Sequence, residues 1–176
     1  PATAEETPTF VAPDTEECNE PEIPCNLTQE LYEFILHIKD HPFLNMTERY
    51  KELGLTSYKG NKLSSTLLER GLCSEVRIKS SGKGRPKKYL ALTKAAMEHF
   101  GPQNLGKGHG GFIHRYYQHR LQGVFKQQGY QPVPEAWLGG KAVDIGLFRD
   151  GKPSIAVEIG LSDTNQELVN FRKDLE

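Results

Sequence analysis

Apolar side chains recur at helical spacing in three short stretches of the first half of the chain. The first stretch follows Thr28, a residue type that caps helix N-termini. It ends at His41, because the next residue, Pro42, disfavours the helical conformation of the residue before it. The second covers residues 45–53 and the third residues 57–70, and a glycine follows each of them. The pattern predicts three consecutive helices joined by tight turns.

The hydrophobic period changes from near 3.6 to 2 after the third helix. Apolar and polar positions alternate over residues 76–79 and again over residues 89–93, on either side of a basic, glycine-containing segment at 80–88. A further helix is predicted over residues 94–100. This order, three helices, a hairpin with a basic tip and a last helix, is typical of a winged-helix domain, which we place at residues 27–101.

The second half of the chain predicts a separate unit of helix and sheet. An apolar stripe at helical spacing is followed by strand patterns at residues 131–138, 142–148 and 154–161, with glycine-containing turns between them. Asp163 can cap a last helix that reaches residue 176. The apolar stripe lies on the helix that begins this second unit and consists of Ile113, Tyr117, Leu121 and Val124.

These patterns divide the chain into four parts and predict an α+β protein. Residues 1–26 contain seven acids, no base and five prolines, so we expect an acidic disordered linker. The winged helix follows, then a flexible joint at residues 102–111, then an α-β-β-β-α unit at residues 112–176 that we expect to be incomplete at its C-terminus.

Charge is separated along the chain. The whole sequence has a formal net charge of −1, so the part after the acidic segment carries +6. Ten Lys or Arg residues lie between positions 59 and 94, against two acids. A local basic excess of this kind is suited to contact with phosphates.

The cysteine count and the hydropathy pattern favour a reduced, cytoplasmic protein. The three cysteines are odd in number, and neither a signal peptide nor an apolar run of 18 residues is present. We therefore expect no membrane partner.

The third helix and the hairpin tip carry the candidate DNA-binding residues. Polar side chains on the helix can donate to phosphates and base edges in a major groove, and bases on a short ribbon suit the backbone or a narrow minor groove. There are two alternative interpretations: a basic face that is only solvated and binds nothing, and a winged helix that contacts only proteins. The candidates are Ser57, Lys59, Asn61, Lys62 and Ser65 on the helix, and Lys83, Arg85, Lys87 and Lys88 in the hairpin.

The segment 27–101 resembles the winged helices of bacterial repressors and of DNA-end or plasmid-processing proteins. The second unit, with Asp144 in one strand and Glu158 in the next, resembles the restriction-endonuclease-like, or PD-(D/E)xK, superfamily. That resemblance implies that Asp144 and Glu158 are metal ligands and catalytic residues that hold Mg²⁺ beside a scissile phosphate, assisted by a lysine. Gly160 stands at the expected lysine position, and Lys173 is the replacement candidate.

The two acids must be close for such chemistry. A three-residue turn over residues 150–152 would pair the strands so that Asp144 lies directly opposite Glu158, with Cβ atoms about 5 Å apart. A two-residue turn would shift the register and separate them.

Three functions follow from these observations. The main interpretation is a DNA-binding module of a larger DNA-processing protein, with a degenerate nuclease-like domain as scaffold. Its partners would be duplex DNA and further domains or subunits of that assembly. The alternatives are a Mg-dependent DNA endonuclease that uses Asp144 and Glu158, and a ligand-controlled transcription regulator.

Overall fold

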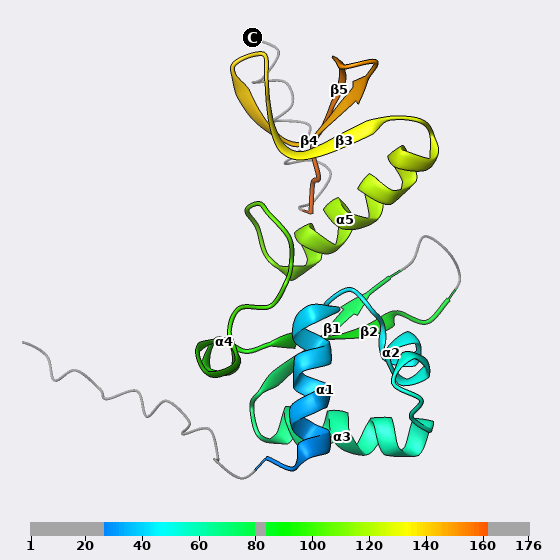
Figure 1. Ribbon diagram of the computed structural model, residues 1–176, viewed down its shortest axis with the longest axis vertical. Coiled ribbons are helices and arrows are strands. Elements are labelled where there is room, and N and C mark those ends of the chain that lie inside the picture. Colours follow the sequence, from blue (N-terminus) through cyan, green and yellow to red (C-terminus); the bar gives the residue numbers. More distant parts are fainter. Residues whose placement is uncertain (1–26, 80–83, 162–176) are drawn as a thin grey trace, which may run out of the picture.

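The winged-helix order predicted from the sequence is present in the first half of the chain (Figure 1). The computed structural model describes residues 27–79 and 84–161. Strands β1 and β2 form an antiparallel hairpin, and β3, β4 and β5 form a separate antiparallel sheet in that order. The elements are α1 (Gln29–Asp40), α2 (Met46–Glu52), α3 (Ser57–Glu69), β1 (Cys73–Ile78), β2 (Lys87–Leu92), α4 (Lys94–Phe100), α5 (Phe112–Gln127), β3 (Gln131–Leu138), β4 (Lys141–Arg149) and β5 (Lys152–Val157).

The helices of the winged helix begin where a side chain caps the backbone. The oxygens of Thr28, Thr56 and Thr93 each accept a hydrogen bond from a backbone N–H in the first turn of α1, α3 and α4. Asn45 and Glu48 form a reciprocal capping box at the start of α2. Each such cap contributes on the order of 1 kcal/mol to the stability of its helix. The capping residues adjoin the helices in sequence, so the local sequence determines where these helices begin.

One hydrophobic core joins the helices to the hairpin. Leu63 and Leu67 of α3 face this core, as the spacing predicted, and the neighbouring Leu68 is partly buried. The buried members come from six different elements and the turn before β1, which is why the four helices and the hairpin fold as one domain. They are Leu31, Phe34, Ile35, Ile38, Tyr50, Leu63, Leu67, Leu72, Cys73, Leu90, Leu92 and Ala96.

A buried arginine holds the turn between α1 and α2. The side chain of Arg49 is 0% exposed, and its guanidinium donates to the backbone oxygens of His37 at 2.8 Å, His41 at 2.8 Å and Leu44 at 3.3 Å. These carbonyls lie in the last turn of α1 and in the turn after it, where backbone donors are few. His37 O also accepts from His41 N at 3.0 Å, and His41 O accepts from Leu44 N at 3.4 Å. Burial lowers the pKa of Arg49 to about 10, so the guanidinium remains charged at neutral pH.

The segment after α4 is anchored at its start, which differs from the flexible joint expected at residues 102–111. The amide oxygen of Gln103 accepts from Leu92 N at 3.1 Å, and its nitrogen donates to the oxygens of Ile38 and Leu90. Asn104 N also donates to Lys39 O at 2.8 Å. The amide of a buried glutamine thus satisfies backbone groups that the sheet and α1 leave open, and ties the segment to both.

Helix α5 lies between the winged helix and the second sheet (Figure 1). A cluster of apolar and aromatic side chains joins α5 to the hairpin and to the α1–α2 turn: Ile78, Tyr89 and Tyr116 are buried in it, with Phe43 and Phe112 packed against them. The Tyr89 hydroxyl donates to the Tyr116 hydroxyl at 3.1 Å. The winged helix and the second unit therefore share this helix.

The opposite side of α5 uses polar side chains against the sheet, which corrects the stripe expected from the sequence. Arg115, Tyr116 and Gln118 are the buried residues of α5, whereas Ile113 is 39% and Val124 is 41% exposed. Gln118 donates hydrogen bonds to Glu135 and Asp144 of the sheet, whereas Arg115 Nη2 donates to the backbone oxygens of Leu105 and Lys107 before the helix. These bonds offset the burial of the two polar side chains. The helix expected at residues 163–176 lies outside the described residues.

The turn between β4 and β5 is shorter than expected, and a bulge restores the predicted register. Asp150 and Gly151 form a two-residue turn with positive φ angles of 52° and 73°. A register shift between Leu147 and Phe148 then returns the pairing to Leu147 opposite Ile155 and Ile145 opposite Val157. Strand β5 ends at Val157, so Glu158 lies just beyond the last paired residue.

The apolar face predicted for the sheet is only partly buried. Val143, Ile145 and Leu147 of β4 are buried, as expected, but Ile155 of β5 is 44% exposed. The protein has the predicted α+β class and a winged helix, while the described residues do not establish a restriction-endonuclease-like core. Within the same residues, every helix is too short or too polar to cross a membrane.

We predict that Arg49→Met lowers the free energy of unfolding by roughly 2–4 kcal/mol, because three carbonyls lose a charged donor inside the core. Urea denaturation followed by circular dichroism measures this difference. Lys51→Met on the exposed side of the same helix is the matched control and should change stability by less than about 0.5 kcal/mol. Equal stability of the two variants would contradict the assigned role.

Candidate nucleic-acid interface

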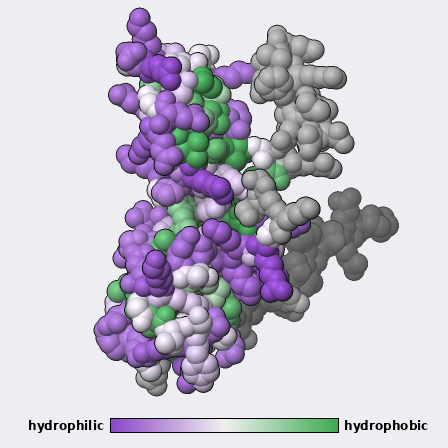
Figure 2. Space-filling model, turned by 90° about the vertical axis from the view of Figure 1, so that its right-hand side faces the viewer, coloured by the Kyte–Doolittle hydropathy of each residue, from purple (hydrophilic) through white to green (hydrophobic). Residues whose placement is uncertain are grey.

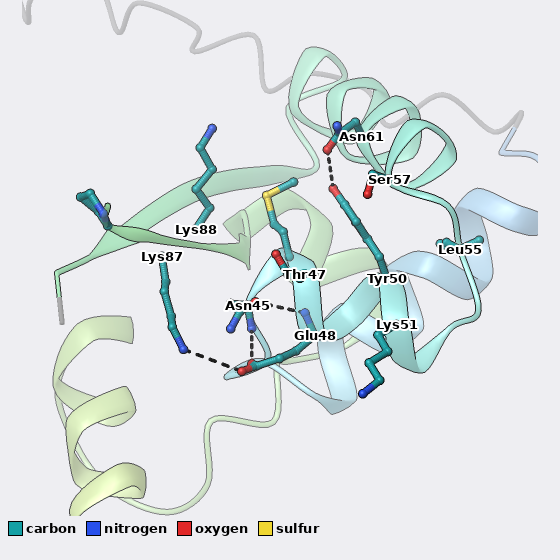
Figure 3. Close-up of a pocket in the computed structure, with 12 residues that line it drawn as sticks. Asn45, Thr47, Glu48, Tyr50, Lys51, Leu55, Ser57, Asn61, Lys87 and Lys88 are labelled. Carbon is teal, nitrogen blue, oxygen red and sulfur yellow. Dashed lines mark hydrogen bonds and ion pairs between the residues drawn. The ribbon is translucent and has the colours of Figure 1, made fainter. Parts of the chain in front are cut away.

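An open groove with a volume of about 1040 Å³ lies between the first turns of α2 and α3 and the start of β2 (Figure 3). We call it the helix–wing groove. Polar and basic side chains make up most of its lining, and it opens on the side of the domain where the hairpin projects. The lining residues are Asn45, Met46, Thr47, Glu48, Tyr50, Lys51, Leu55, Ser57, Asn61, Pro86, Lys87 and Lys88.

A close approach of α2 to α3 fixes the helical wall of this groove. A Cβ atom at Gly60 would lie 2.5 Å from Cδ1 of Tyr50, so only glycine lets the Tyr50 ring pack against α3 at this point. The Tyr50 hydroxyl then donates to Asn61 Oδ1 at 3.1 Å and lies 2.9 Å from Ser64 Oγ. Burial raises the pKa of Tyr50, so the hydroxyl stays protonated and holds Asn61 at the groove (Figure 3).

The structure separates the five candidates on α3 into three groups. Ser57 and Asn61 line the helix–wing groove. Lys62 and Ser65 are exposed on the outer surface of the helix. Lys59 is different, because its Nζ forms an ion pair with Glu30 Oε1 at 2.5 Å beside a separate pocket against α1. Lys59 therefore lines this pocket and not the helix–wing groove, and its contact with DNA stays a prediction.

Tyr58 is a surface residue that the candidate set did not include. Its side chain is 80% exposed at the start of α3, next to the groove residue Ser57. The signal was present in the sequence, since an aromatic residue in a polar helical turn has no apolar neighbours to pack against.

The hairpin side of the groove carries basic residues in different electrostatic settings. Arg85 is exposed, and Lys87 Nζ lies 3.8 Å from Glu48 Oε1. Lys88 Nζ lies 2.9 Å from Glu75 Oε2, and this hydrogen bond lowers the pKa of Glu75. Lys83 lies outside the described residues. The start of β2 thus presents more positive than negative charge to the groove.

Asp144 and Glu158 have different surroundings in the second unit. Asp144 Oδ2 accepts from Ile159 N at 2.6 Å, and Oδ1 lies 3.2 Å from His114 Nε2. Glu158 is exposed and lines a pocket with Tyr117 and Ile159 instead. The magnesium site expected between Asp144 and Glu158 stays a prediction, and Lys173 lies outside the described residues.

Asp144 belongs to a different cluster. One ligand atom each of His114, Glu135 and Asp144 lies within 4.8 Å of the others, and all three side chains are half-buried. The β3–β4 register places Glu135 opposite Asp144, between the pairs Pro134–Ile145 and Ala136–Val143. The sequence gave no indication of Glu135, because two prolines interrupt the pattern of β3.

Hydrogen bonds hold Glu135 in its ionised form. Partial burial acts to raise its pKa, but donors from Gln118 Nε2 at 3.0 Å and His109 N at 3.2 Å, with Arg115 at 3.7 Å, outweigh burial. The pKa of Glu135 therefore lies below its ordinary value. The same Gln118 nitrogen donates to Asp144 O at 2.7 Å, which ties α5 to both strands.

We predict that Glu135→Gln destabilises the protein at neutral pH and that the deficit shrinks on acidification. A carboxylate with a depressed native pKa stabilises the fold above its unfolded pKa of about 4.3, and this contribution is lost as the pH falls through the native value. Urea unfolding of both proteins at pH 7 and at pH 3.5 measures the change. The exposed Glu98→Gln is the matched control, and a Glu135→Gln deficit that is the same at both pH values would contradict the prediction.

Comparison with known proteins gives one structural likeness. No protein-family model matches the chain, and no curated protein matches it. The transcriptional regulator PcaV from Streptomyces coelicolor, solved in complex with its natural ligand, is similar at 22% identity and a TM-score of 0.37, over 58% of this chain and 71% of that chain. The assignment of a winged helix to this protein accordingly rests on its own element order and packing.

Proposed function

We propose that this protein binds duplex DNA through its winged helix, as the DNA-binding module of a larger DNA-processing assembly. One observation carries the proposal: the polar side of α3 and the basic start of β2 border the same open groove. A solvated basic face would not require the two elements to converge.

The groove suggests how each part meets the duplex. Exposed Lys62 and Ser65 on α3 are placed to enter a major groove, where side chains reach base edges. The sugar-phosphate strand beside it would pass over the helix–wing groove, within reach of Ser57 and Lys87. Arg85 would meet the backbone or the neighbouring minor groove.

Removing the three described bases of the hairpin together should weaken DNA binding. We expect the triple variant Arg85→Ala, Lys87→Ala, Lys88→Ala to bind a 25-base-pair duplex at least about tenfold more weakly at 0.15 M salt. Loss of up to three phosphate contacts should also reduce the slope of log affinity against log salt by about 2 to 3. Fluorescence anisotropy over a salt series measures both quantities.

A matched control variant removes the same number of positive charges outside the winged helix. Lys107, Lys126 and Lys152 are exposed bases outside the winged helix, and their triple alanine variant should keep both the affinity and the salt slope. If the two triple variants lose affinity equally, binding depends on overall charge and the assignment of the groove is wrong.

We propose a scaffolding role for the unit of α5 and β3–β5. This is supported by the hydrogen bond from Ile159 N to Asp144, which occupies one oxygen of the expected metal ligand, and by Gly160 at the position expected for lysine. Figure 2 shows a hydrophobic patch in the upper part of one face, over this unit. An exposed apolar surface of this kind is suited to contact with further domains or subunits.

Control of DNA binding by a small ligand is a second candidate function. A cleft of about 590 Å³ lies between the α1–α2 turn and α5, with an apolar part from Pro42, Phe43 and Tyr116 and a polar part that includes His119 and Arg120. This volume is within the usual range for small-molecule sites. A ligand there would contact the winged helix and α5 together, and so would change how the hairpin is supported.

A variant that fills the cleft tests this function. Gly123 lines it and has no atom within 4 Å of the position of a Cβ, so Gly123→Trp can occupy the opening without a backbone clash. In a thermal-shift screen of small aromatic acids and amines, we expect compounds that stabilise the wild type and Gln127→Trp, but not Gly123→Trp, and that change the affinity for DNA. Compounds that stabilise all three proteins equally would contradict the assignment of the cleft.

A further inference from the structure

His114, Glu135 and Asp144 converge from one helix and two strands. His114 is on α5, Glu135 is on β3 and Asp144 is on β4, and one ligand atom from each lies within 4.8 Å of the other two. His114 and Asp144 are 30 positions apart in the sequence, so the tertiary fold brings them together. The proposed binding of DNA does not use them.

The hydrogen bonds that hold each carboxylate fall on one of its two oxygens. Among the described residues, the contacts of Glu135 with Gln118, His109 and Arg115 all fall on Oε1. Asp144 Oδ2 accepts from Ile159 N, which leaves Oδ1 on the side of His114. Hydrogen bonds to the remote oxygen are how proteins orient metal-binding carboxylates.

The separation of the two nearest atoms suits a shared cation. His114 Nε2 and Asp144 Oδ1 are 3.2 Å apart. Adjacent ligands of an ion with bonds near 2.1 Å are separated by about 3.0–3.4 Å in octahedral or tetrahedral geometry. A neutral imidazole can therefore bind the cation beside the carboxylate without a large movement of either side chain.

We propose that His114 Nε2, Glu135 Oε2 and Asp144 Oδ1 form a binding site for one divalent first-row transition-metal ion. An imidazole and two carboxylates are a mixed nitrogen and oxygen set, which suits Mn²⁺, Fe²⁺ or Zn²⁺ better than the all-oxygen preference of Ca²⁺. Gln118 is a positioning residue, because its amide holds Glu135 and the backbone of Asp144 together. The ligand set differs from the Asp144 and Glu158 pair expected from the sequence.

Titration of the EDTA-treated full chain with Mn²⁺ tests the site. Mn²⁺ is the probe because cysteine sulfur favours softer ions such as Zn²⁺, and this chain has three cysteines. Room-temperature EPR counts the free hydrated ion, and we expect one Mn²⁺ bound per chain. Pulsed EPR of the unmodified protein should show coupling of the bound ion to one imidazole ¹⁴N, which needs no variant.

Variants then locate the ion. His114→Gln, Glu135→Gln and Asp144→Asn should each weaken Mn²⁺ binding at least about tenfold, and His114→Gln should remove the ¹⁴N coupling. Two control variants each remove a possible metal ligand outside the proposed site. Glu158→Gln tests the pair expected from the sequence, and His41→Gln tests a group of His37, His41 and Glu52 that could also hold a metal. Both should bind Mn²⁺ as the wild type does.

The outcomes separate cleanly. Absence of saturable binding, or unchanged binding in all three ligand variants, overturns the proposal. Loss of binding in Glu158→Gln would place the ion between Asp144 and Glu158, and loss in His41→Gln would place it on the winged helix, and either result overturns it as well. If a ligand variant fails to fold by circular dichroism, a missing ¹⁴N coupling in the wild type is still decisive against the site.

Discussion

Helix α5 is packed on both sides, and the arrangement of the two halves of the protein depends on that constraint. On one side, Tyr116 packs into the aromatic cluster with Tyr89 of the hairpin. On the other side, the amide of Gln118, which is 1% exposed, bonds to groups of β3 and β4. Apolar packing tolerates small rotations, whereas a buried hydrogen-bond network does not, so the polar side sets the rotation of the helix and the aromatic side transmits it to the hairpin.

The sequence predicts the winged helix well because its signals are local. Helix starts at Thr28 and Thr93 and the change of hydrophobic period at the hairpin each depend on neighbouring residues, and the structure contains these elements at nearly the predicted bounds. The β4–β5 connection shows the limit of this reasoning. An extra residue in the turn and an extra residue in a bulge at Ser154 leave the same alternation in the paired strands, so the pattern cannot distinguish them.

The candidate sites depend on contacts between distant residues, and sequence patterns do not contain these. Lys59 is a reasonable DNA ligand by its place on α3, but Glu30, 29 positions away, pairs with it. Glu135 was missed because the β3 pattern is interrupted by two prolines and gives no clear face, while Asp144 stood out as an acid between apolar positions. Arg49 was missed for a similar reason, since nothing local distinguishes a buried arginine from an exposed one.

The anchoring of Gln103 has a mechanical consequence. Its amide is bonded to the backbone of α1 and of β2, so a force applied to the second unit enters the winged helix in the middle of its core and not at the end of α4. The force therefore does not pass through helix α4. Strand β2 also forms one wall of the helix–wing groove, so tension on the second unit would act directly on the surface that we propose faces the duplex.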